Sequence, residues 1–189
     1  RDVQDASYSS SGDIQIKSGE SNGGDSGSVT ISTGTSTTGE SGSIRIDVGD
    51  TANGRGGNIS LEAGSSLANE GANIGGSVNI ASGRSASGYS GNIGISTPPS
   101  LTSESGNVTI STGTSESGNA SGDISLIAGT ASIGEGGSTY ITGGFSDSDR
   151  GGHVNLFGGK TINGEEAGGV RIRGGSNEKT GKGGNVELS

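Results

Sequence analysis

The sequence predicts an all-β fold, a parallel β-solenoid, on three observations. A phrase close to SG-x-(I/V)-x-(I/L)-x-x-G, with Gly or Ala in place of the Ser in half of the copies, recurs twelve times, as in SGSVTISTG at 26–34 and SGNVTISTG at 105–113. Its anchoring glycines are 15 or 16 residues apart, except for one interval of 19. Only 25% of the residues are hydrophobic, so neighbouring copies must share one thin core. We therefore expect about twelve coils of 15–16 residues with a flat, two-sheet cross-section.

The first element of each repeat is a short strand. Aliphatic residues fall at alternate positions of the phrase, which is the period of a strand buried on one face. We expect them to form an inward core ladder. Its members are Ile14, Ile16, Val29, Ile31, Ile44, Ile46, Ile59, Leu61, Val78, Ile80, Ile93, Ile95, Val108, Ile110, Ile124, Leu126, Ile141, Val154, Leu156, Val170, Ile172, Val186 and Leu188.

The second element is a returning strand that carries small residues. A small residue follows the aliphatic pair, as at Thr33 and Ala63, and a Ser or Thr recurs beyond the next glycine, as at Ser36 and Ser85. Glycines at the corners suit tight turns that need positive φ or close backbone approach. An antiparallel meander is the competing fold, but the sequence offers no second apolar element to cover its aliphatic face.

The chain divides into a lead-in or partial coil at 1–10 and a tandem-repeat region at 11–189, with an insertion near 64–76. The repeat region resembles the Gly/Ser/Thr-rich tandem repeats of extracellular β-solenoid proteins, of the algal cell-surface or phage and bacterial fibre-shaft type. The resemblance rests on the phrase alone. It implies a structural or adhesive role at a cell or virion surface, and it carries over no catalytic residue.

Residues for catalysis or metal binding are sparse. His153, the single histidine, lies near Asp147 and Asp149 in sequence, but we read it as an outward-facing residue beside a solvated turn. Acids precede four phrases, but Arg55, Tyr89 and Arg150 take the same slot elsewhere, so no repeated calcium cage is expected. The four acids are Asp25, Glu40, Glu104 and Glu135. We expect neither enzymatic activity nor a cofactor.

Two features predict self-association. Ile127, Tyr140 and Phe157 take outward slots on three consecutive repeats, which predicts an exposed apolar stripe for a lateral contact. Net charge is −5 over residues 1–84, −6 over 85–149 and +2 over 150–189, where Arg171 and Arg173 lie. An acidic beginning and a basic end favour head-to-tail stacking.

The remaining partner classes follow from composition. With a net charge of −9 the chain is a poor nucleic-acid ligand, and no apolar run is long enough to span a membrane. Outward Thr30, Thr109 and Thr142 raise an alternative, an ice-binding or adhesive module with a surface or glycan ligand, although charged residues interrupt the row. Three sequons mark possible glycosylation of a secreted protein: Asn58, Asn107 and Asn119. We thus expect an extracellular or surface protein that forms a rod, fibre shaft or filament segment by coil stacking and assembly.

Overall fold

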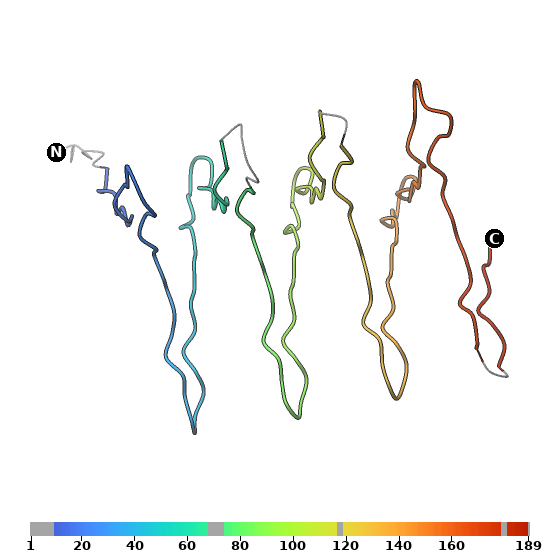
Figure 1. Ribbon diagram of the computed structural model, residues 1–189, viewed down its shortest axis with the longest axis horizontal. Coiled ribbons are helices and arrows are strands. Elements are labelled where there is room, and N and C mark those ends of the chain that lie inside the picture. The colour runs from blue at the N-terminus through green and yellow to red at the C-terminus, as the bar shows by residue number, and fades with distance from the viewer. Residues whose placement is uncertain (1–9, 68–73, 117–118, 179–180, 189) are drawn as a thin grey trace, which may run out of the picture. The chain divides into compact units, whose positions relative to one another are not determined.

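The computed structural model describes residues 10–67, 74–116, 119–178 and 181–188, and these ranges contain no helix and no strand. Figure 1 accordingly shows the described chain as a plain trace without coils or arrows. The predicted parallel β-solenoid is therefore wrong, because no paired strands are present in these ranges. Two compact units, Arg1–Ile93 and Gly94–Ser189, divide the chain, and both repeat one local pattern. Almost all of the lead-in at 1–10 lies outside the described residues.

The expected core is also absent. No side chain in the described ranges is buried, and every member of the core ladder is at least 47% exposed. At the extremes of the ladder, Ile14 is 92% and Leu188 is 87% exposed. The alternating aliphatic residues are present in each phrase, but the described chain provides nothing that covers them.

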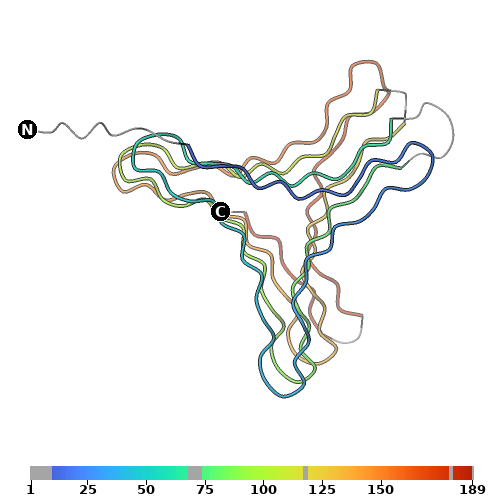
Figure 2. The same cartoon turned by 90° about the vertical axis from the view of Figure 1, so that its left-hand side faces the viewer.

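The local pattern is an extended phrase followed by a loop. The chain bends sharply at the tip of each loop, as at 22–24, 37–39, 86–88 and 147–149. Figures 1 and 2 show the two legs of such a loop running side by side to a pointed end. The repeat therefore turns back on itself locally, between one phrase and the next.

A neck closes the loop where its two legs meet. We use this word for the glycine that ends one phrase together with the glycine that anchors the next, such as Gly83 and Gly91. The Gly91 amide donates a 2.9 Å hydrogen bond to the Gly83 carbonyl oxygen. Equivalent bonds of 2.8–2.9 Å join Gly76 to Gly64, Gly137 to Gly129, Gly152 to Gly144, Gly168 to Gly159 and Gly184 to Gly175.

The small residue of each phrase packs at the neck. A Cβ placed on Gly91 would lie 3.3 Å from the Ser82 Cβ, and one on Gly106 would lie 3.3 Å from the Thr97 Cγ2. Thr33 adds a hydrogen bond of 3.2 Å from its hydroxyl to the Gly42 carbonyl. These residues are small because an anchor glycine passes beside them, and not because they face an aliphatic row across a core.

At the last three of these necks the small residue of the phrase is itself a glycine. Gly143, Gly158 and Gly174 stand where earlier phrases have Ser, Thr, Val or Ala. A methyl group on Gly158 would overlap the Gly168 carbonyl, whose carbon would lie 2.7 Å away. The two backbones therefore approach so closely that only glycine fits.

Side-chain hydroxyls close the tips of the loops. The Gly88 amide donates a 2.8 Å hydrogen bond to the Ser85 Oγ, three residues earlier. The same bond joins Gly24 to Ser21, Gly39 to Ser36, Ser103 to Ser100, Asp149 to Ser146 and Gly164 to Thr161. Ser and Thr close turns in this way because the hydroxyl replaces a backbone acceptor. The residues expected on a returning strand thus form the turn itself.

This local closure explains why the solenoid does not form within the chain. A coil needs the second half of the repeat to travel back and lay the next phrase beside the last one. Here the second half of the repeat forms a loop instead. The hydrogen bond at the neck of that loop joins glycines only eight to twelve positions apart. Positive φ contributes little to the corners: among the described residues only Gly54 and Gly134 adopt it, with φ of 153° and 102°.

Candidate functional site

The phrases are the candidate site, because they carry the regular chemistry of the chain on an open surface. Ladder residues from Val29 to Ile172 are 47–74% exposed. Apart from Val48, which is 43% exposed, the large apolar residues off the ladder, such as Ile127 and Phe157, are at least 86% exposed. The two sides of a phrase therefore differ: the ladder side is half sheltered and aliphatic, and the other side is open to solvent.

The backbone of the phrases is open as well. In the described ranges every backbone-to-backbone hydrogen bond closes a neck, and none joins one phrase to another. Extended backbone with unpaired amide and carbonyl groups is a template for pairing with another strand. Each phrase thus presents a polar edge and an aliphatic face together.

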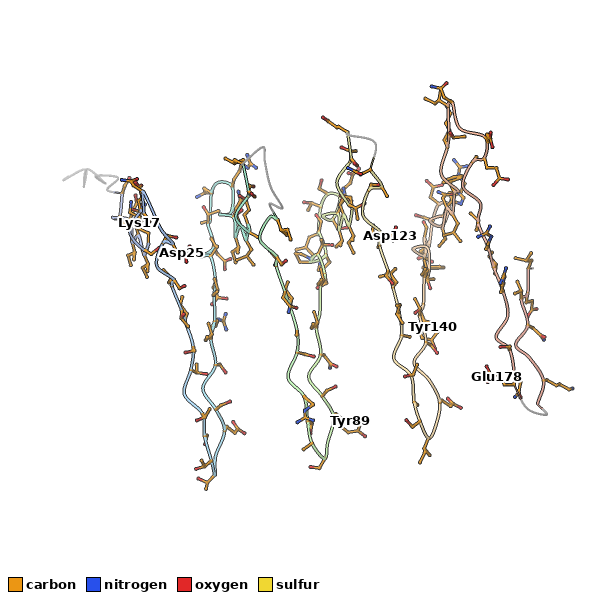
Figure 3. The ribbon with its side chains drawn as sticks, viewed as in Figure 1. Lys17, Asp25, Tyr89, Asp123, Tyr140 and Glu178 are labelled. Atoms are coloured by element: carbon orange, nitrogen blue, oxygen red, sulfur yellow. The ribbon has the colours of Figure 1, made fainter. Side chains whose placement is uncertain are left out.

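Part of the predicted apolar stripe gathers in one place. Ile127 and Tyr140 line an open hollow of about 460 Å³ together with Leu126, Ala128 and Ile141. The loop between Gly129 and Gly137 brings these two stretches together, since its neck lies between them. Phe157 is 86% exposed and is not among the lining residues. Figure 3 labels Tyr140, whose side chain projects from its leg of the chain.

Two further hollows each lie at a single loop. One of about 410 Å³ lies within the loop at 49–57, and one of about 370 Å³ lies against Thr112, Ser115 and Asn119. Both are lined mainly by glycine and short polar side chains. Neither gathers an acid, a base and a nucleophile, which a catalytic site requires.

The charged residues that the structure describes form no metal-binding cluster. The described residues contain no group of three or more His, Cys, Asp or Glu that could hold a metal ion. His153 and the four acids that precede phrases are all exposed. Arg45 and Asp47 form an exposed ion pair within one phrase, and such a surface pair contributes little to stability.

The remaining predicted residues are exposed at separate points of the chain. Arg171 and Arg173 are exposed on one phrase, as are Thr30, Thr109 and Thr142 on three others. Asn58, Asn107 and Asn119 are exposed at their sequons. No helix in the described ranges is long and apolar enough to cross a membrane.

No family model, no curated protein and no solved structure matches the chain.

Sequence reasoning missed the closures at the neck and at the tip. The signal for the tip was present in the spacing, because Ser21, Ser36 and Ser85 each precede a glycine by three residues. The signal for the neck was the pairing of a small residue with the next anchor glycine. Both patterns had been read as parts of a strand that the structure does not contain.

Proposed function

We propose that this chain is a structural repeat protein that self-associates into a rigid fibre or filament segment. The observation that carries the proposal is the open aliphatic ladder. It recurs on every phrase, and no described residue buries it. A feature that is repeated over twelve equivalent phrases supports a structural role and not a single local site.

The accessible surface supports assembly. The chain exposes 19898 Å², about 2.5 times the area expected for a compact folded protein of its mass. Apolar area removed from water contributes about 25 cal/mol per Å². Burial of the phrases would therefore be strongly favourable in free energy, and the described loops of the chain do not bury them.

The proposed setting is a cell or virion surface. The chain has no cysteine and a net charge of −9, and its exposed sequons suit a secreted protein that carries glycans. It needs no cofactor, nucleic acid or membrane insertion for this role. The phrases and necks consist mainly of aliphatic residues, hydroxyl-bearing residues and glycine.

Negative-stain electron microscopy of the purified chain tests the proposal. We expect filaments or rods of uniform width, lengthening as the protein concentration rises. Isolated particles with no elongated species at any concentration would reject the structural role.

A further inference from the structure

We infer that the phrases pair between chains: copies of the protein lie parallel and in register, so that each phrase forms a strand beside the same phrase of a neighbouring copy. This inference rests on the proposed function and names its partner, a second copy of the chain. It places β-structure and the buried ladder in the assembly, whereas the described residues of the single chain have neither.

The polar edge of each phrase requires such a partner. In the described ranges the backbone hydrogen bonds lie at necks, so the peptide groups between Gly27 and Thr33, for example, have no backbone partner. The six necks that carry a backbone hydrogen bond also oppose pairing within the chain, since each of them folds its loop locally. A phrase of another copy meets no such constraint, and it has the same length and the same alternation.

The aliphatic face points to the same partner. In a parallel, in-register pair, identical side chains stack about 4.8 Å apart, so Val29 meets Val29 and Ile31 meets Ile31. The half-sheltered ladder would then become continuous along the stack. An unrelated partner would have to match eleven aliphatic pairs and the single Ile141 at intervals of 15, 16 and 19 residues, and a second copy matches them by identity.

Charge permits this stacking. The slot between the two ladder positions would place identical residues next to each other, which is unfavourable for like charges. Only three of its twelve occupants are charged, namely Arg45, Arg171 and Glu187. Arg45 already has Asp47 as its ion-pair partner within the phrase.

The register follows from the number of phrases that can pair. A slip by one repeat leaves one phrase unpaired at each end and loses its hydrogen bonds and its burial. A slip also sets the loop at 64–76 beside a shorter one, because the single 19-residue interval comes fourth in the series. In register, all phrases pair and each loop lies beside a loop of its own length.

Engineered cysteines test the register directly. The chain has no cysteine, so Thr30→Cys and Thr109→Cys each supply one thiol, in nearly identical phrases. The spacing of paired strands, about 4.8 Å, lies within the Cα separation that a disulfide spans. The two variants are mixed under reducing conditions, assembled together, oxidised and mapped by mass spectrometry.

We expect links from 30 to 30 and from 109 to 109, with links from 30 to 109 almost absent. Random pairing makes the mixed link half of the total, because the two phrases are so alike, whereas pairing slipped by one repeat brings no two thiols together. Such a share, or an assembled protein that forms no link, overturns in-register pairing and leaves the proposed fibre role intact. A protein that stays monomeric contradicts both in-register pairing and the proposed fibre role.

A second pair of variants protects the test against a local folding defect. Ser60→Cys and Ser125→Cys place thiols in the same slot of two other phrases. The reduced variants must assemble like the unmodified chain before they are oxidised. The same pattern of like-with-like links is expected, and mixed links at the random share would again overturn the inference.

Discussion

Single glycines at the necks act mainly by close approach. Gly158 and Gly159 are adjacent, yet their surroundings are opposite. A methyl group on Gly158 would overlap the Gly168 carbonyl, whereas one on Gly159 would meet nothing within 4 Å. Substitution by alanine is therefore expected to cause a steric clash at Gly158 and none at Gly159.

We expect Gly158→Ala to open its neck and Gly159→Ala to leave it closed. The reason is the steric overlap, which forces the backbones apart and breaks the 2.9 Å bond from Gly168 to Gly159. Hydrogen exchange of the Gly168 amide measures this bond, and it should lose its protection in the first variant only. Equal exchange rates in the two variants would contradict the account of the neck.

The hydroxyls at the loop tips give a second prediction at this scale. Ser85→Ala removes the acceptor of the Gly88 amide, and a neutral hydrogen bond of this kind contributes about 1 kcal/mol. We expect faster exchange at Gly88, by roughly fivefold. Ser87→Ala, two residues away in the same loop, is the control and should leave the Gly88 amide unchanged.

At the scale of the element, the strands predicted for both halves of the repeat are wrong, because the described residues contain no strand. The alternating Val29 and Ile31 are 54% and 71% exposed and are not buried on one face. Ser36 lies where the returning strand is expected, but its hydroxyl accepts a hydrogen bond from the Gly39 amide and closes a turn.

The error has a physical cause. A Ser that faces a core and a Ser that closes a turn have the same sequence spacing, and the residue three positions later does not distinguish them, since it is Gly39 after Ser36 and Asp149 after Ser146. The alternation of aliphatic residues, by contrast, indicates one apolar face on each phrase. Whether that face is covered by the same chain or by another copy depends on long-range pairing, which the spacing of one repeat does not encode.

A substitution within one phrase tests what the ladder does. Ile31→Ser removes an aliphatic side chain from the ladder, and Thr30→Ser makes a smaller change on the opposite side of the same phrase. Burial of an isoleucine contributes about 1.5–3 kcal/mol. We expect the first variant to need roughly ten to one hundred times more protein to assemble.

Light scattering across a concentration series measures this threshold. Thr30→Ser should assemble at nearly the concentration of the unmodified chain. If both variants shift the threshold equally, the two sides of the phrase are equivalent and the ladder has no special role.

At the scale of the whole molecule, charge separates two modes of assembly. Parallel chains in register bring together copies that each carry −9, so added salt should screen their repulsion and lower the threshold for assembly. Head-to-tail contact between an acidic beginning and the basic segment at 150–189 is an attraction, which salt weakens. The direction of the salt effect, measured by light scattering, therefore distinguishes the two modes.

The charge-swapped variant Arg171→Glu with Arg173→Glu complements the salt series. Head-to-tail attraction predicts that this variant fails to assemble. In-register pairing predicts only a modest rise of the threshold, because like charges already stack at Arg171 and Arg173 and only the net charge of each copy changes, from −9 to −13.

The central claim is that the phrases become buried only when copies associate. Sedimentation equilibrium over a range of concentrations, together with thermal unfolding of the same samples, tests it most directly. We predict species whose masses are multiples of 18.2 kDa and an unfolding midpoint that rises with concentration, because association stabilises the folded state by mass action. A single 18.2 kDa species that unfolds cooperatively at one temperature, whatever its concentration, would contradict the claim.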